Sequence, residues 1–210
     1  MRIKRPNKKK EQAAETRKKL YDSARSLFIE KDFASVGVED ITDAAGITKG
    51  AFHVHFESKD ALIALIIADY AAQADMDYKS FLEALPDHMP ADEVFLALIA
   101  KIADVLTGTI GYENMKKVYQ MLLAGTVDTE AVKGYGREFY LLFQDVLNKG
   151  IRQGKFKNSL PVDEIARHLV MAIRGVSYEW CIRYPGFDLK EQATAHFKLL
   201  LEGLKTNQKI

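Results

Sequence analysis

Residues 36–62 contain two short amphipathic helical segments joined by a tight turn at a glycine, and this is the most informative part of the sequence. Val38, Ile41 and Ala45 follow one another at helical spacing, so they share one face of a first short helix. Gly46 follows directly and suits the positive-φ position at which one helix ends and the chain turns into the next. The segment is therefore predicted to form two helices joined by a tight turn.

The second helix of this segment has two different sides. Thr48 is placed to cap its first turn, and Phe52 and Phe56 lie four residues apart, facing the same core. Its opposite side carries Thr48, Lys49 and His53, which are small, polar or basic. In a helix-turn-helix, that side of the second helix enters the DNA major groove. The pattern predicts a DNA-binding head.

The sequence around this segment resembles the TetR family of bacterial transcriptional regulators. The residues that carry the resemblance are Thr16-Arg17, Leu20, Ala24, Leu27-Phe28, Asp40-Ile41, Ala45-Gly46-Ile47-Thr48, Gly50, Phe52, His55-Phe56, Ser58-Lys59-Asp60 and Leu62. They cover about the first third of the chain in one register, which is more specific than a lone helix-turn-helix pattern. Three positions depart from the family pattern: Thr42 stands where Ala is usual, and His53 and Val54 stand where Tyr is common.

The resemblance and the pattern together predict the DNA-contacting residues. Thr48, Lys49 and His53 are expected to touch the groove or its phosphates, whereas Gly50 and Ala51 lack bulk and allow close approach to the bases. Lys59 and His55 are expected at phosphates, as the family's matching Lys is. The full predicted set is Arg17, Thr42, Thr48, Lys49, Gly50, Ala51, His53, His55 and Lys59.

Charge is concentrated at the start of the chain. The net charge is +1 over 210 residues, but the first 19 residues carry nine Lys or Arg against Glu11 and Glu15, giving +7. A basic arm of this kind binds phosphates or a minor groove. The alternative is a solubilising tail that is disordered without DNA, and the two are compatible.

Composition places the chain among globular proteins of the cytoplasm. Apolar residues make up 48% and charged residues 28% of the sequence, and no run of apolar residues approaches the ~20 needed to cross a bilayer. Cys181 is the only cysteine, which excludes an internal disulfide and fits a reducing compartment.

The helical pattern predicts an all-α protein of three parts: a basic arm (1–14), a head (15–60, with the helix-turn-helix at 37–56) and a larger helical ligand-binding and dimerisation domain (61–206). A first helix is expected at about 15–31, and a helix capped by Ser58 at about 59–85. Further helices are expected at about 92–106, 112–124, 128–152, 162–183 and 189–205, the last begun by a capping box of Asp188 and Glu191.

Two stripes of apolar residues, one on each of the last two expected helices, are candidates for self-association. In the TetR family the last two helices pair with those of a second subunit as a four-helix bundle. The residues assigned to this interface are Ala172, Gly175, Ala193, Phe197, Leu200 and Leu204. The stripes alone are equally compatible with packing inside one subunit.

The middle of the body is rich in aromatic residues and methionine. The family commonly binds a small effector in this domain, and an interior of this kind suits a flat or elongated apolar ligand. The candidate ligand-binding residues are Tyr119, Met121, Tyr140, Phe143, Met171, Arg174, Tyr178 and Trp180. Arg174 is the candidate partner of an anionic effector, the alternative being a salt bridge within the chain, for instance to Glu179.

Catalytic and metal chemistry find little support. His53 and His55 lie two residues apart, so on a helix they point about 200° apart and cannot chelate one ion. No phosphate-binding loop or nucleophile motif occurs. No metal, cofactor or enzymatic activity is therefore expected.

The sequence thus predicts a homodimeric TetR-like regulator, a repressor released from a palindromic DNA operator by a small-molecule effector. The alternative is a TetR-like dimer that acts as a protein-interaction adaptor without specific DNA binding.

Overall fold

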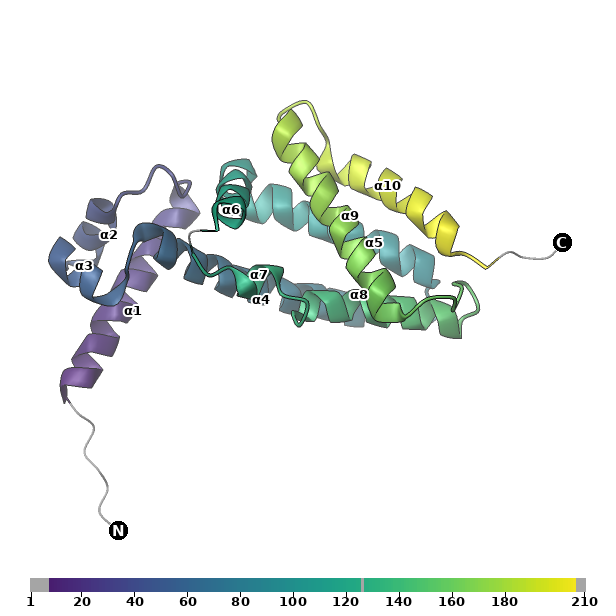
Figure 1. Ribbon diagram of the computed structural model, residues 1–210, viewed down its shortest axis with the longest axis horizontal. Coiled ribbons are helices and arrows are strands. Elements are labelled where there is room, and N and C mark those ends of the chain that lie inside the picture. Colours follow the sequence, from purple (N-terminus) through teal and green to yellow (C-terminus); the bar gives the residue numbers. More distant parts are fainter. Residues whose placement is uncertain (1–7, 126, 207–210) are drawn as a thin grey trace, which may run out of the picture. The chain divides into compact units, whose positions relative to one another are not determined.

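The structure, a computed structural model, describes residues 8–125 and 127–206 and is built almost entirely of helices (Figure 1). The described chain divides into two compact units. The first comprises the residues up to Asp69 together with Gln120–Thr129, and the second comprises Tyr70–Tyr119 and the residues from Glu130 onward. The prediction of an all-α fold is confirmed.

The first unit is a three-helix head. Helix α1 (Lys8–Glu30) packs against α2 (Val38–Ala45) and α3 (Lys49–His55), and the chain then enters α4 (Lys59–Glu83). Its core consists of fully buried side chains from all four helices and from the loop after α1: Leu20, Ala24, Phe28, Phe33, Val36, Ile41, Phe52, Phe56, Leu62, Ile63 and Ile66.

Helix α1 is longer than predicted. It begins at Lys8 rather than near Glu15, so residues 8–14 of the predicted arm form its first two turns, and residues 1–7 lie outside the described part. These turns are Lys-rich but contain no Gly or Pro to interrupt the helix.

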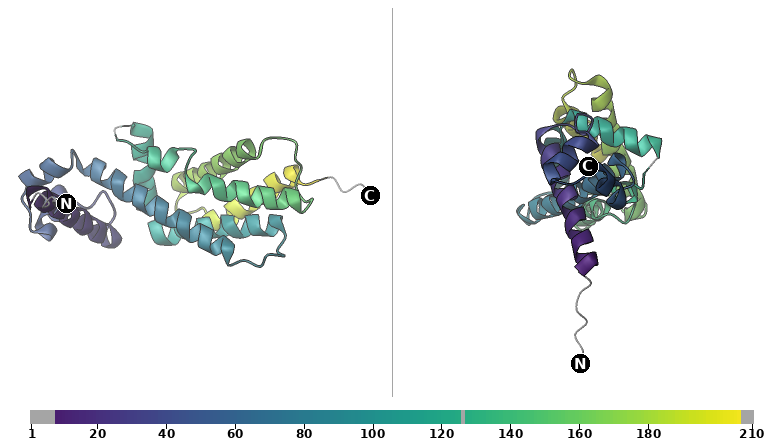
Figure 2. Two further views of the ribbon diagram at one scale, coloured as in Figure 1. Left: turned by 90° about the horizontal axis from the view of Figure 1, so that it is seen from below. Right: turned by 90° about the vertical axis from the view of Figure 1, so that its left-hand side faces the viewer.

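The second unit is a helical body around one hydrophobic core. Helix α5 (Ala91–Asp104) ends in a π-helical turn, η1 (Val105–Ile110), and α6 (Tyr112–Ala124) follows. After the short α7 (Glu130–Lys133), helix α8 (Glu138–Arg152) packs against α9 (Val162–Arg183) and α5, and α10 (Leu189–Leu204) packs against α5 and α9. The views in Figures 1 and 2 show α5, α8, α9 and α10 packed together.

Aromatic rings fill the centre of this body. The ring of Phe95 on α5 lies 5.4 Å from that of Phe143 on α8 and 6.5 Å from that of Phe197 on α10. All three side chains are fully buried. The last turn of α8 is equally tight, because Gly150 lies directly against the ring of Phe156 and leaves no space for a Cβ atom.

Apart from the start of α1, the predicted helices agree with the structure except in one place. The helix expected at 128–152 is divided into α7 and α8 by the segment from Gly134 to Arg137, so that prediction is wrong. Arg137 is extended (φ −66°, ψ 141°) at the start of α8, and its side chain forms an ion pair with Asp75 of α4. A tertiary contact 62 residues away therefore fixes the break.

Two predicted helix caps are present. Ser58 Oγ accepts a hydrogen bond from the Ala61 amide (3.0 Å) at the start of α4, and Asp188 Oδ1 accepts one from the Glu191 amide (2.9 Å) at the start of α10. The reciprocal bond from the Glu191 side chain is not found among the described residues, so only the first half of that capping box is formed.

Within residues 8–125 and 127–206, no single helix is long and apolar enough to cross a membrane; one pair, Ala91–Ile110 with Tyr112–Ala124, passes that test jointly but is bent by 99°.

Candidate nucleic-acid interface

The turn between α2 and α3 has the geometry that the sequence predicts. Gly46 lies in the left-handed region (φ 65°, ψ 37°), and its amide donates to Asp43 O while the next amide, that of Ile47, donates to Thr42 O. Thr48 is extended, and its Oγ1 accepts a hydrogen bond from the Ala51 amide (3.3 Å). A side chain at position 46 would be strained in this conformation.

The inner side of α3 is anchored by its two phenylalanines. Phe52 and Phe56 are buried, with ring centroids 5.7 Å apart. This fixes the rotation of α3 about its axis. Thr48, Lys49, Gly50 and His53 are consequently exposed on its opposite side, while Ala51 and His55 are half-buried at the edges.

Lys49 is oriented by α2 across the turn. Its Nζ forms an exposed ion pair with Glu39 Oε1 at 2.9 Å. An ion pair of this kind contributes little to stability, ~0–1 kcal/mol, so a phosphate can replace the carboxylate without a large penalty. Glu39 is a residue that the sequence reasoning missed, because the pairing crosses the turn and follows no helical spacing.

Thr42 does not belong to the exposed surface. Its side chain is only 3% exposed, and its Oγ1 donates to Glu39 O (3.0 Å) within α2. The prediction that Thr42 contacts DNA is therefore wrong. Position 42 follows Ile41 directly in a short helix whose buried face is wide enough to include both residues.

Lys59 has a structural task that the sequence did not indicate. Its Nζ donates to Phe33 O (3.0 Å) and Val36 O (2.9 Å), carbonyls of the loop between α1 and α2. Two of its three N–H groups are thereby used inside the head. The predicted phosphate contact of Lys59 depends on the third and stays a prediction.

Arg17 is held beside the helix-turn-helix by stacking. It is exposed on α1, with its guanidinium carbon 4.8 Å from the ring centroid of Phe56. Cation–π contact of this kind positions an arginine without consuming its N–H groups. At the far end of α3, Val54 is 79% exposed, so the position where Tyr is common carries a bare apolar side chain.

The predicted ligand-binding residues fall into two groups. Met121, Tyr140, Phe143 and Trp180 are buried, and Tyr119 and Arg174 are half-buried. Burial raises the pKa of Tyr119 to about 12, and its hydroxyl is bonded to Ser177 Oγ (2.5 Å). The interior position predicted for Met171 and Tyr178 is wrong, since they are 48% and 43% exposed.

The predicted dimer residues are largely internal. Ala193 and Phe197 are fully buried, and Ala172, Leu200 and Leu204 are half-buried against the core of the same subunit. Ala193 and Phe197 therefore cannot face a second subunit, and that prediction is wrong. Of the six, Gly175 alone is exposed. Helical spacing identified residues that share a face, but not the partner of that face.

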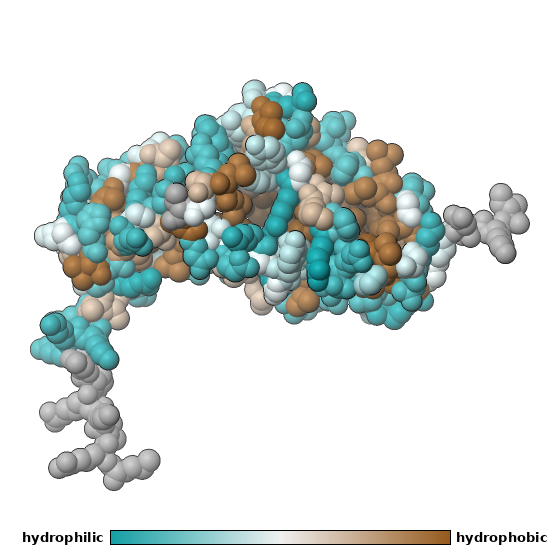
Figure 3. All heavy atoms as spheres, in the orientation of Figure 1, coloured by the Kyte–Doolittle hydropathy of each residue, from teal (hydrophilic) through white to brown (hydrophobic). Residues whose placement is uncertain are grey.

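An apolar face nevertheless remains uncovered on the same two helices. On α9, Met171, Gly175, Tyr178 and Ile182 are exposed at helical spacing, and on α10 Leu199 is 74% exposed. We call these five residues the α9–α10 face. Figure 3 shows hydrophobic side chains on the surface where these helices lie.

Comparisons with known proteins agree with this geometry. Residues 20–66 match the family model described as bacterial regulatory proteins, tetR family. The transcriptional repressor KstR2 of Rhodococcus jostii (strain RHA1) is 24% identical over 191 residues, 90% of each chain. The transcriptional regulator AcrR of Shigella flexneri is 25% identical over 206 residues, 93% of this chain and 92% of AcrR.

Solved structures share the fold. A TetR-family transcriptional regulator from Pectobacterium atrosepticum superposes with a TM-score of 0.73 at 20% identity, over 94% of this chain and 98% of that one. FadR from Bacillus subtilis, in complex with stearoyl-CoA, superposes with a TM-score of 0.67 at 18% identity, over 89% of this chain and 98% of FadR. None of these relatives supports a protein-interaction adaptor. The head of the chain is thus a DNA-binding domain of the TetR type, and the relatives that match over most of the chain are transcriptional regulators.

Proposed function

We propose that this protein is a homodimeric repressor that binds a palindromic operator in bacterial cytoplasm and is released by a small-molecule effector. The arm and head (1–14 and 15–60) are assigned to DNA, and the body (61–206) to the effector and to dimerisation. The observation that carries the proposal is the α2–Gly46–α3 turn, in which buried phenylalanines present the polar side of α3 outward.

The exposed chemistry of α3 suits both groove and phosphate. Lys49 offers a charge whose present partner is weakly held, and Thr48 and His53 offer hydrogen-bonding groups beside it. Gly50 has open space around its Cα, so a base edge or phosphate can approach the backbone closely. The basic first turns of α1 add sequence-independent attraction.

The homodimer is supported by the α9–α10 face. Four large apolar side chains exposed on two adjacent helices are unfavourable in water, and a second copy of the same face covers them by two-fold symmetry. Gly175, within the stripe, allows close approach of the two α9 backbones. A dimer also supplies the two heads that a palindromic operator requires.

An effector is supported by the relatives. FadR of Bacillus subtilis was solved with stearoyl-CoA, and a related solved structure is a ketosteroid transcriptional regulator, KstR2 of Mycobacterium tuberculosis. Stearoyl-CoA joins a long apolar acyl chain to a phosphorylated head, and a ketosteroid is a largely apolar ring system. The aromatic interior around Tyr140 and Phe143 provides comparable chemistry in this chain.

The first experiment is fluorescence anisotropy with DNA from upstream of the protein's own gene and a scrambled duplex, over a salt series. Specific binding at ~10 nM, ~1000-fold tighter than to the scrambled duplex, is expected. Lys49→Ala is expected to weaken binding and to reduce the salt slope by about 2, one phosphate for each subunit. Lys155→Ala, an exposed lysine of the body, is the matched control. Equal affinity for both duplexes would favour the adaptor alternative.

The dimer has a separate test. Tyr178→Asp places a charge in the α9–α10 face and is expected to yield monomers by light scattering, whereas Leu160→Asp, at an equally exposed apolar residue outside that face, leaves the dimer intact. A monomeric wild-type protein, or a dimeric Tyr178→Asp variant, would remove the support for this interface.

A further inference from the structure

Arg174 is a charged residue without a carboxylate partner in the described chain. It lies on α9, half-buried, and the Glu179 that the sequence offered as its partner is paired with Arg183 instead. Its guanidinium donates from Nη2 to the carbonyl of Val132 in α7 (3.0 Å). A guanidinium has five N–H donors, so most of its capacity is unused.

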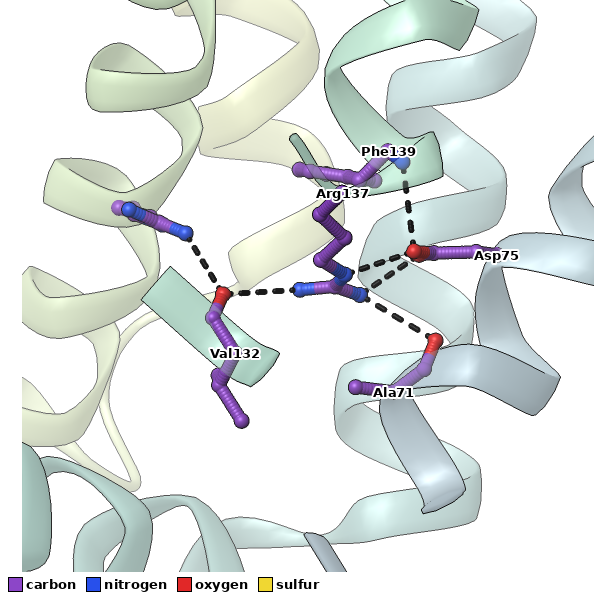
Figure 4. Close-up of polar contacts among 6 residues, drawn as sticks. Ala71, Asp75, Val132, Arg137 and Phe139 are labelled. Atoms are coloured by element: carbon purple, nitrogen blue, oxygen red, sulfur yellow. Dashed lines mark hydrogen bonds and ion pairs between the residues drawn. The ribbon is translucent and has the colours of Figure 1, made fainter. Parts of the chain in front are cut away.

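The neighbouring arginine is, by contrast, fully neutralised. Arg137 donates from Nε and Nη2 to the two carboxylate oxygens of Asp75 (2.7 and 2.6 Å), and from Nη2 to Ala71 O (3.3 Å). Its Nη1 approaches the same Val132 carbonyl at 3.4 Å. Figure 4 shows the Arg137 guanidinium between this carbonyl and the Asp75 carboxylate, whereas Arg174 donates to the carbonyl and forms no ion pair with Asp75 in the described part of the chain. The uncompensated positive charge of this cluster therefore belongs to Arg174.

A buried hydroxyl without a partner lies beside that charge. Tyr140 on α8 is 1% exposed, and its hydroxyl is fully buried with no atom of the described residues in hydrogen-bonding geometry. The guanidinium carbon of Arg174 lies 5.6 Å from the centroid of the Tyr140 ring. Burial raises the pKa of Tyr140, and the charge of Arg174 opposes that rise, so the hydroxyl stays protonated and able to donate.

An unsatisfied buried hydroxyl and an unpaired guanidinium both cost free energy in the free protein. One ligand group removes both costs: an oxyanion that accepts from Arg174 and from Tyr140. Both residues lie in the same compact unit, on adjacent helices. The ring of Tyr135 lies edge-on to that of Tyr140, with centroids 5.2 Å apart, so an aromatic surface adjoins the two groups.

Resting on the effector binding proposed above, we infer that Arg174 and Tyr140 bind the oxyanion of an acidic, largely apolar effector. A carboxylate suits the planar fork of Arg174, because two parallel N–H···O bonds form to its two oxygens. The phosphates of a CoA thioester offer similar oxygens, so the two sources have to be separated by experiment.

The test uses the full-length protein and isothermal titration with butyrate, octanoate, palmitate and benzoate, with octanoyl-CoA, and with octanol and benzyl alcohol as neutral counterparts. At least one acid is expected to bind wild type. Its affinity is expected to fall by about 100-fold in Arg174→Met and by about 10-fold in Tyr140→Phe, the loss typical of a charge-assisted and of a neutral hydrogen bond. The alcohols are expected to bind all three proteins equally.

Thermal unfolding separates a ligand role from a structural one. Because the Tyr140 hydroxyl has no partner in hydrogen-bonding geometry among the described residues, Tyr140→Phe is expected to unfold at the same temperature as wild type or higher, as does the exposed Tyr184→Phe. Arg174→Lys keeps the charge but loses the fork, and is expected to bind the acid with intermediate affinity. A destabilised Tyr140→Phe would reveal an internal partner and overturn the inference.

Other outcomes also overturn it. These are that none of the anionic probes binds, that Arg174→Met binds acids as wild type does, or that octanoyl-CoA binds through its phosphates independently of Arg174. Failure of the regulator itself is distinguishable, because anisotropy with DNA is measured on the same preparations. Acid binding through Arg174 without operator binding would support this site and refute the proposed repressor. Operator binding without acid binding would support the repressor and refute this site.

Discussion

The ion pair of Asp75 and Arg137 allows the sharpest stability prediction. The Asp75 side chain is 3% exposed and that of Arg137 17%, and Asp75 also accepts from the Phe139 amide (3.2 Å). In Asp75→Ala the guanidinium and this buried amide lose their acceptors together. Breaking a buried pair from one side costs about 3–5 kcal/mol, and the residual exposure of Arg137 places this case near 3 kcal/mol.

The measurement is the free energy of unfolding from urea titration followed by circular dichroism. Asp77→Ala is the matched control, at an exposed carboxylate on the same helix that accepts from Gln73, and is expected to change the free energy by less than about 0.5 kcal/mol. A loss in Asp75→Ala no larger than in Asp77→Ala would refute the reasoning.

The double variant Asp75→Leu/Arg137→Met tests whether the cost comes from an uncompensated charge. Replacing both members of a buried pair by apolar residues of similar volume is often neutral, because neither charge then has to be desolvated. More than half of the stability lost in Asp75→Ala is expected to return. If the double variant is as unstable as the single one, the geometry of the hydrogen bonds rather than the charge holds α4 to α8.

Three further outcomes follow from single side chains. Lys59→Ala is expected to lower the free energy of unfolding by about 1–3 kcal/mol by urea titration, since two loop carbonyls lose a charged donor, whereas Lys49→Ala changes it by less than about 0.5 kcal/mol. Gly150→Ala is expected to lower the free energy of unfolding by about 1–3 kcal/mol in the same assay, because the added Cβ would lie 2.0 Å from a ring carbon of Phe156. Gly203→Ala, which has open space at its Cβ, is the control and is expected to leave the free energy unchanged. Burial raises the pKa of the Cys181 thiol from 9.0 to about 11. Labelling of Cys181 by a thiol reagent at pH 8 is therefore expected to be about 100-fold slower in the folded protein than in the urea-unfolded chain, and to accelerate as the pH approaches 11. Equal labelling rates in the two states would contradict this prediction.

The head was predictable from sequence because its determinants are local. The Gly46 turn, the Thr48 cap and the spacing of Phe52 and Phe56 act within a few residues of one another, and each takes the predicted geometry. Lys59 was not predictable in the same way. Its partners, the carbonyls of Phe33 and Val36, are 23 to 26 residues away and carry no side-chain signal.

In the body, the sequence predicted helices but not their neighbours. The stripe of Ala193 and Phe197 and the exposed stripe of Met171 and Tyr178 have the same helical period, and only packing decides which faces the core. Likewise, the break before Arg137 depends on a carboxylate 62 residues earlier rather than on the glycines that permit it. Periodicity gives the faces of a helix, and tertiary contacts determine what each face meets.

Helix α4 links these observations to regulation. Two of its carboxylates bond groups outside the helix: Asp69 accepts from the hydroxyl of Tyr21 on α1, and Asp75 is held by Arg137. Because α4 is one continuous helix, we predict that a change at Arg137 is transmitted along it to Asp69. We predict that an anion that draws Arg174 from the Val132 carbonyl also changes the contact of that carbonyl with Arg137.

Tyr21→Phe removes the hydroxyl that receives this change in the head while leaving the effector residues untouched. Operator affinity without effector is expected to stay within about 3-fold of wild type, and the affinity for an acidic effector is expected to be unchanged. The factor by which that acid weakens operator binding, about 5–150-fold in a typical coupled system, is expected to fall at least about 5-fold. The measurement is anisotropy with operator DNA at zero and saturating acid, with Tyr184→Phe as the matched loss of a hydroxyl. Undiminished release in Tyr21→Phe would mean that α4 acts on the head through its apolar packing at Leu62, Ile63 and Ile66, not through the Tyr21–Asp69 bond.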